Sequence, residues 1–192
     1  MLELLLLLGM KIIYFGTGAR TKENTGLTTF GKQYIKKMNE TKMLIDVSHS
    51  SQKTFWDTVK LSQAPVIATH SCAYALCHHP RNLSDEQIKQ IVNMNGIIGI
   101  CYCATFLSET GIATVRDIVK HICYIANLVG TNYIGLGSDF DGLDEEEQTE
   151  GVRNISDIPN LILELQKAGF NKQEIEKIMG KNWIRVLGEN IK

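Results

Sequence analysis

The sequence predicts an α/β protein with a parallel sheet built from about five strand–helix units. Short runs rich in isoleucine, valine and leucine alternate along the chain with longer segments that have helical periodicity. The short runs are apolar almost throughout, which is expected for parallel strands that helices cover on both faces. The predicted strands are residues 11–15, 43–47, 65–69, 96–101 and 133–137.

The segments between these strands begin and end as helices do. Ser84 starts the motif Ser-Asp-Glu-Gln, a capping box that precedes a run with helical periodicity. Residues 115–129 place apolar side chains at helical spacing, and Gly130 supplies the stop. A second capping box begins at Asn171. Because no linker or repeat interrupts the alternation, we expect a single domain over residues 1–192, with too few units to close an eight-stranded barrel by itself.

The N-terminal residues 1–10, MLELLLLLGM, are apolar but lack the features of a signal peptide. No basic residue precedes the apolar run, and Glu3 interrupts it. The run is also too short to span a bilayer. We therefore expect a buried helix at this end of the chain.

The composition is that of an ordinary globular protein, with 44% hydrophobic and 21% charged residues. A net charge of −1 gives no reason to expect nucleic acid or an anionic membrane as a partner. The five cysteines form no spaced framework, and their odd number favours reduced thiols over a disulfide scaffold. These observations predict a cytoplasmic protein.

Three of the predicted strands run into side chains that can do chemistry. The second strand is followed by His49, the third by His70, and the fifth by Asp139 and Asp141. Functional groups of α/β sheets gather where the strands end, so we expect these side chains to lie close together. Two imidazoles suit a zinc ion that keeps an open position for water, and a nearby carboxylate can bind substrate or relay a proton.

Other polar residues have simpler interpretations, because a lone histidine is more often a hydrogen-bonded core or surface residue than a ligand. His78 and His79 lie in a polar stretch that predicts a solvated loop, and His121 lies in a helix and is expected to be structural. Cys72 is interpreted as a small buried side chain rather than a nucleophile. Arg81 has the planar fork that grips a carboxylate, and the alternative is a surface ion pair.

Five longer motifs occur in a fixed order along the chain. They are Gly26-Leu-Thr-Thr-Phe-Gly31, Ile45-Asp-Val-Ser-His49-Ser-Ser, Ala64-Pro-Val-Ile-Ala-Thr-His70-Ser, Pro80-Arg81-Asn82-Leu-Ser-Asp and Gly135-Leu-Gly-Ser-Asp139-Phe-Asp141-Gly142. In order and spacing these motifs resemble the membrane (renal) dipeptidase family of zinc metallopeptidases, in particular its bacterial-type members. No single motif is specific, but several in register make a chance match very improbable.

The resemblance implies a (β/α)8 TIM-type barrel of which this chain forms the C-terminal part. It also implies two zinc ions, bridged by a carboxylate and a hydroxide, that hydrolyse dipeptides. By resemblance, His49 and His70 are the histidine ligands of the second zinc ion, and Arg81 binds the carboxylate of the dipeptide. Asp139 is implied to contact the substrate amine and to take part in proton transfer.

The chain departs from the family pattern towards its N-terminus. No histidine precedes His49, so the His-x-Asp pair of the first zinc site has no counterpart, and Glu3 does not stand where the bridging glutamate is expected. The family's substrate-binding histidine is replaced by Gly16-Thr17-Gly18. We therefore expect a truncated chain with weak zinc affinity and little or no activity.

Two alternatives stand beside this expectation. One is a non-catalytic half-barrel that pairs with a copy of itself as a homodimer, or binds another partner through an exposed sheet edge. The other is a different binuclear metallohydrolase on the same barrel, such as an amidase. Zinc retention and dipeptide hydrolysis by the purified protein distinguish a dipeptidase from the half-barrel. Turnover of dipeptides against cyclic amides by the intact homologue distinguishes it from the amidase.

Overall fold

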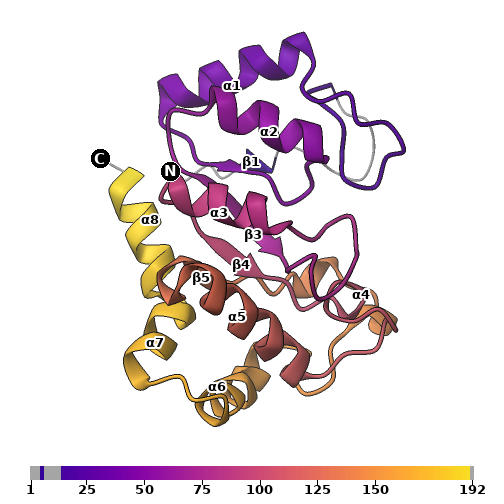
Figure 1. Ribbon diagram of the computed structural model, residues 1–192, viewed down its shortest axis with the longest axis vertical. Coiled ribbons are helices and arrows are strands. Elements are labelled where there is room, and N and C mark those ends of the chain that lie inside the picture. The colour runs from indigo at the N-terminus through magenta and orange to yellow at the C-terminus, as the bar shows by residue number, and fades with distance from the viewer. Residues whose placement is uncertain (1–4, 7–13, 191–192) are drawn as a thin grey trace.

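The centre of the molecule is a five-stranded parallel sheet, seen in a computed structural model that describes residues 5–6 and 14–190 (Figure 1). The strands lie in the sheet in the order in which they occur in the sequence, and each pairs in parallel with the next. They are β1 (Leu5–Leu6), β2 (Ile45–Asp46), β3 (Val66–Ser71), β4 (Ile98–Ile100) and β5 (Ile134–Leu136). Sequential parallel strands joined by helices are the construction of a (β/α)8 barrel, and these five units form part of one.

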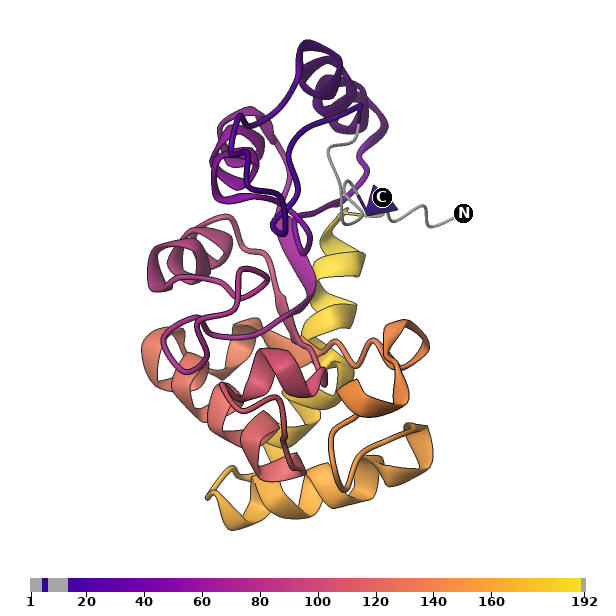
Figure 2. The same ribbon diagram turned by 90° about the vertical axis from the view of Figure 1, so that its right-hand side faces the viewer.

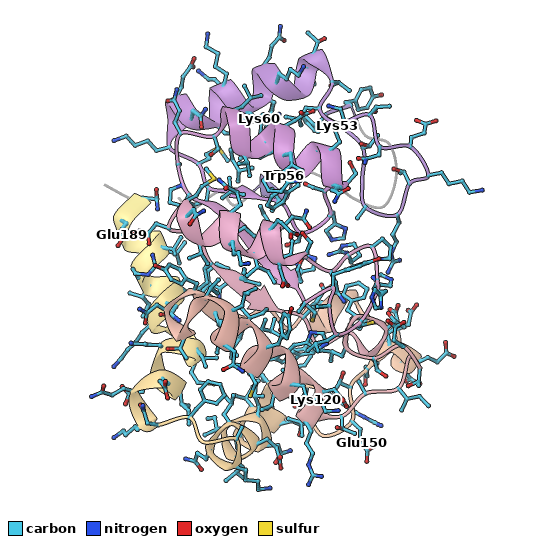
Figure 3. All side chains as sticks on the ribbon, viewed as in Figure 1. Lys53, Trp56, Lys60, Lys120, Glu150 and Glu189 are labelled. Atoms are coloured by element: carbon cyan, nitrogen blue, oxygen red, sulfur yellow. The ribbon has the colours of Figure 1, made fainter. Side chains whose placement is uncertain are left out.

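Helices lie between successive strands and continue after the last one. They are α1 (Thr29–Thr41), α2 (Gln52–Leu61), α3 (Asp85–Asn93), the short α4 (Ala104–Leu107), α5 (Val115–Val129), α6 (Ile158–Lys167), α7 (Lys172–Glu176) and α8 (Asn182–Asn190). Charged side chains of these helices face the solvent: Glu189 on α8 lies at the edge of the molecule (Figure 3), and Lys120 on α5 is exposed. In the part of the chain that the structure describes, no helix is long and apolar enough to cross a membrane.

The helix boundaries follow the local sequence. Helix α5 begins and ends at the predicted residues, and Gly130 ends it with a φ angle of 85° that favours glycine. The predicted capping boxes before α3 and α7 are both present, each with a reciprocal pair of hydrogen bonds at Ser84 and Asn171. These helix ends confirm the predicted boundary residues of α3, α5 and α7.

Apolar side chains pack against both faces of the sheet. On one face, β3 and β4 contribute to a large core with helices α2, α3 and α5, which includes Phe55, Val66, Ala68, Ile88, Ile91, Ile98, Ile100, Ile118 and Ile122. On the other face, Ile67 and Ile97 pack with Val186 of α8. Figure 2 accordingly shows α8 on the opposite side of β3 from α3. The strands are therefore covered on both faces, as their continuous apolar sequences predict.

Strands β3, β4 and β5 approach one another closely beside Thr69. A Cβ atom added to Gly99 or to Gly137 would lie 2.1 Å from the Thr69 carbonyl oxygen. Only glycine allows this approach. The close contact brings the carboxyl ends of the three strands, and the residues that follow them, to one place.

The N-terminal part differs from the sequence-based expectation. Residues 1–10 were expected to form a helix, but Leu5–Leu6 form strand β1, which pairs with Ile45 and Asp46 of β2. Of the strand expected at 11–15, residues 11–13 lie outside the described residues, and Tyr14 and Phe15 lie in a turn. The physical reason is that a short apolar run suits a buried strand and a buried helix equally well, and only its pairing partner decides between them.

The five cysteines are all free thiols, as their number and spacing predict. Cys72, Cys77, Cys101 and Cys103 are buried, and Cys123 is partly exposed. They act as small apolar side chains in and around the core.

Candidate metal centre

His49, His70 and Asp139 come together at the carboxyl ends of β2, β3 and β5. The Nε2 atoms of the two imidazoles are 2.9 Å apart, and Nε2 of His70 is 3.9 Å from Oδ2 of Asp139. His70 is the penultimate residue of β3, and the two others lie in the loops that follow their strands. The structure thus places the three side chains around one point, as expected from their positions at the strand ends.

Both imidazoles are held in the neutral form. Burial, together with the positive charges of Arg81 and Arg20, lowers the pKa of His49 to about 3. Burial also lowers the pKa of His70, although the carboxylates of Asp46 and Asp139 partly oppose this effect. A neutral imidazole has a lone pair for a metal ion, so near pH 7 the pair has the protonation state that a metal site requires.

The turn that carries His49 is supported by the segment before α1. The amide N–H of Ala19 donates to the carbonyl oxygen of His49 over 2.8 Å. Thr17, which is 1% exposed, shares a hydrogen bond of 2.8 Å between its hydroxyl and that of Ser51. The stretch that departs from the family pattern therefore holds the turn in place, and its threonine hydroxyl is occupied within the protein.

Arg81 is a buried cation without an ion-pair partner in the described part of the chain. Its side chain is 4% exposed, its Nε–H donates to the carbonyl oxygen of Ser48 over 2.8 Å, and Nη2–H donates to that of His70 over 3.4 Å. Burial lowers the pKa of its guanidinium. The surface ion pair considered from the sequence is therefore wrong. A buried guanidinium held only by carbonyl groups favours an anion beside it.

Phe106 of α4 organises the surroundings of this cation. The guanidinium carbons of Arg81 and Arg20 lie 5.1 Å and 5.9 Å from its ring centroid. His79 stacks on the same ring at 4.4 Å, and burial, followed by the two arginines, lowers its pKa to about 4. The solvated-loop prediction is right for His78, which is exposed and pairs with a surface glutamate, but it is wrong for His79. The reason is that α4 comes from a distant part of the sequence.

A cavity of about 370 Å³ adjoins the paired histidines without including them. Its walls come from the loop at residues 19–24, the start of α2 and the segment before α3. Ser48 and Arg81 line the cavity and also contact each other. Arg81 therefore borders the cavity and also contacts the backbone of His70.

Asp46 is a site residue that the sequence interpretation did not single out. It is 1% exposed, yet both of its carboxylate oxygens accept hydrogen bonds from Ser48 or Thr69. The signal that points to it is a carboxylate within an otherwise apolar strand, because a buried charge persists only where it is fully hydrogen-bonded.

Two residues set aside from the sequence have the expected structural roles. His121 is 1% exposed, accepts a hydrogen bond from the amide of Ala73 and donates one to the carbonyl oxygen of Leu107. Cys72 is fully buried, and burial raises the pKa of its thiol well above the usual value. Neither side chain is available for chemistry.

The histidine pair supplies part of a metal site. Two imidazole nitrogens that face the same point are donors that zinc prefers, and the Asp139 carboxylate adjoins them. Among residues 5–6 and 14–190, however, no group of three or more histidine, cysteine, aspartate or glutamate side chains is arranged to hold a metal ion. The described residues therefore fit two ligands, and a complete centre needs at least one further donor.

A parallel sheet of barrel type, with neutral imidazoles and a carboxylate at the carboxyl ends of its strands, is the framework of many metal-dependent hydrolases. The match to known families is more specific. The family model of membrane dipeptidase, peptidase family M19, matches residues 13–192. The chain belongs to this family.

Relatives of known sequence or structure match most of the chain. An uncharacterized protein in the pqqA 5′ region of Klebsiella pneumoniae is 40% identical over 166 residues, which are 84% of this chain and 60% of that protein. Dipeptidase tcpJ of Claviceps purpurea is 38% identical over 165 residues, which are 85% of this chain and 38% of that protein.

Among solved structures, a metallopeptidase from Rhodobacter sphaeroides, liganded with a phosphinate mimic of the dipeptide L-Ala-D-Ala, has a TM-score of 0.85 and 30% identity. The match covers 92% of this chain and 52% of that one. The chain thus spans between 38% and 60% of the length of these relatives.

Proposed function

We propose that this chain carries half of the active site of a zinc-dependent dipeptidase, with His49 and His70 as metal ligands. The observation that carries the proposal is the meeting of two neutral imidazoles, Nε2 to Nε2, beside Asp139 at the mouth of a barrel-type sheet. Membership of the membrane dipeptidase family and a relative that binds a dipeptide mimic support it. A metal pair in the complete enzyme would polarise the peptide carbonyl and activate a water molecule.

Arg81 and Asp139 give the site two ends of opposite charge. Arg81 adjoins His70 through the His70 carbonyl oxygen, and Asp139 adjoins it through the imidazole. We assign the carboxylate of the dipeptide to the guanidinium, which has donors to spare, and the ammonium group to Asp139. Fixed charges at both ends restrict the substrate to a short zwitterion.

Asp139 is placed to move a proton as well. Its carboxylate is partly exposed and lies 3.9 Å from the neutral His70 ring. When the peptide bond breaks, the new amine needs a proton, and a carboxylate within reach of that nitrogen can take a proton from the attacking water and then deliver it to the amine. Asp139 therefore acts in both substrate binding and proton transfer in this proposal.

The 192-residue chain by itself is expected to hydrolyse dipeptides weakly or not at all. Two imidazoles cannot complete a zinc site, and among the described residues no third histidine, cysteine, aspartate or glutamate side chain is arranged with them to hold a metal ion. We expect weak zinc binding that still depends on His49 and His70.

The free thiols support a reducing compartment such as the cytoplasm.

Equilibrium dialysis with Zn²⁺ tests the proposal directly. The wild-type chain, His49→Ala, His70→Ala and the matched control His121→Gln are compared at pH 7. Loss of zinc binding in both active-site variants but not in the control supports the metal assignment. Equal binding by all four proteins rejects it. Full turnover of L-Ala-D-Ala by the isolated chain would contradict the expectation of an incomplete centre.

A further inference from the structure

We propose that Asp46 and Thr69 are positioning residues that fix the tautomer of His70, so that its Nε2 atom faces His49 with a lone pair. The inference deepens the proposed function, because a metal ligand needs that lone pair. The tautomer itself, however, can be observed without any metal ion.

The argument begins with Asp46, whose buried carboxylate can only accept hydrogen bonds. Oδ1 accepts from the Ser48 amide over 3.0 Å, from the Ser48 hydroxyl over 2.6 Å and from the Thr69 amide over 3.1 Å. Oδ2 accepts from the hydroxyl of Thr69 in a short hydrogen bond. The carboxylate is therefore saturated, and it takes the single hydroxyl proton of Thr69.

Thr69 connects Asp46 to His70 and fixes the direction of the hydrogen bond to the imidazole. Its Oγ1 lies 2.8 Å from Nδ1 of His70. Since the hydroxyl proton already points at Asp46, the oxygen can only accept from the ring, and Nδ1 must carry the imidazole proton. A neutral ring has one proton, so Nε2 of His70 is left with its lone pair.

The two histidines of the pair are then not equivalent. Nε2 of His70 accepts, so Nε2 of His49, 2.9 Å away, must donate. No described group forms a hydrogen bond with Nδ1 of His49 that would fix its tautomer. His70 is thus prepared for a metal ion in advance, and His49 must move its proton to Nδ1 before both nitrogens can face one ion.

Nuclear magnetic resonance of the metal-free chain at pH 7 tests this chain of hydrogen bonds. Long-range ¹H–¹⁵N correlations distinguish a protonated ring nitrogen from an unprotonated one. We expect His70 to be protonated at Nδ1 and His49 at Nε2. A wild-type His70 protonated at Nε2 would overturn the proposal.

Asp46→Asn is the sharpest variant because it should reverse the chain of hydrogen bonds. The Asn Oδ1 keeps the three donors that face Asp46 Oδ1, since turning the amide would set its NH₂ against two backbone N–H groups. The NH₂ group then donates to Thr69, and the Thr69 hydroxyl donates to Nδ1 of His70. We expect the His70 proton to move to Nε2. An unchanged tautomer in a folded variant would contradict the assignment.

Thr69 offers a matched pair of variants. Thr69→Ser keeps the hydroxyl and should keep the wild-type tautomer, whereas Thr69→Val removes the connection and should give a mixture of tautomers. Ser48→Ala is the control, because it removes the Ser48 hydroxyl, with its hydrogen bonds to Asp46 and the His70 amide and its 3.3 Å contact with Thr69 Oγ1, but leaves the Thr69 hydroxyl in place between Asp46 and His70. If Ser48→Ala changes the tautomer as much as Thr69→Val does, the effect is general loosening of the site, and the proposal fails.

Zinc titration supplies a second readout. We expect Asp46→Asn to lower the Zn²⁺ affinity of the chain by about 10–100-fold, and Thr69→Ser to stay within a few-fold of wild type. A wild-type chain that shows the expected tautomers but binds no zinc would reject the proposed metal site and leave the hydrogen-bond chain standing. Affinity that is equal in wild type and Asp46→Asn, despite a reversed tautomer, would show that the tautomer does not serve metal binding.

Discussion

Two buried regions of this protein contain histidine, and they use the imidazole ring in opposite ways. In the core beside α5, His121 accepts from the Ala73 amide at Nδ1 and donates to the Leu107 carbonyl oxygen at Nε2. At the strand ends, Nδ1 of His70 is engaged by the Thr69 hydroxyl, and Nε2 faces the His49 imidazole at 2.9 Å and the Asp139 carboxylate at 3.9 Å. A ring with both nitrogens bound to the backbone is part of the fold. A ring that is oriented at one nitrogen and open at the other is prepared for a ligand.

The largest effect on the unfolding free energy should come from replacing the structural histidine, His121. His121→Leu leaves the Ala73 amide and the Leu107 carbonyl oxygen buried without partners, which costs roughly 2–4 kcal/mol of unfolding free energy. Chemical denaturation measures this loss. Zinc binding by the folded fraction should be unchanged. A stability change below about 1 kcal/mol would show that the two hydrogen bonds are replaced by other contacts.

The pH dependence of the unfolding free energy should reflect the histidines whose pKa is lowered in the folded protein. His49, with a pKa lowered to about 3, and His79, with one lowered to about 4, stay neutral in the folded protein, whereas an unfolded histidine titrates near 6.5. The unfolded state therefore binds more protons below pH 6.5, and stability is complete above pH 6.5 and falls towards pH 4. In denaturation experiments across this range, His79→Gln should make the fall shallower. An equal slope in wild type and variant would contradict the burial of this ring.

A smaller effect on the unfolding free energy is expected from changing Phe106, whose ring lies beside the guanidinium groups of Arg20 and Arg81. Phe106→Leu keeps an apolar side chain but removes the face on which His79 and Arg81 lie, which costs about 1–2 kcal/mol. Thermal denaturation measures the loss, and Phe140→Leu, which changes an aromatic ring that packs against Tyr102 instead, is the control. If the Phe106 variant is as stable as wild type, the contacts of the ring face with His79 and Arg81 do not contribute to stability, and the side chain acts only by filling apolar volume.

The smallest effect on stability is expected at the prepared site itself. His49→Ala removes a ring whose imidazole has one described hydrogen-bond partner, His70, so the unfolding free energy should change by less than about 1 kcal/mol. This result, set beside that of His121→Leu, would sharpen the contrast between the two regions. A large loss would place His49 among the structural residues.

The sequence alone was sufficient for the parts of this protein that depend on local chemistry. The bounds of α5 and the capping boxes before α3 and α7 depend on neighbouring residues and on nearby backbone groups. The places of His49, His70 and Asp139 follow from a general rule, because parallel strands end on one side of a sheet. Their motifs also identified the family, which the match over residues 13–192 shows.

Only the tertiary structure decided the features that join distant parts of the chain. Leu5 and Leu6 form a strand because β2 offers them a partner, and His79 is half-buried because Phe106 reaches it from beyond β4. The protonation of His70 is set by a carboxylate on the neighbouring strand, through a hydroxyl on its own. Periodicity and composition describe how each residue relates to its neighbours in sequence. A ring nitrogen's proton depends on which atoms lie about 3 Å away, and folding brings those atoms from different strands.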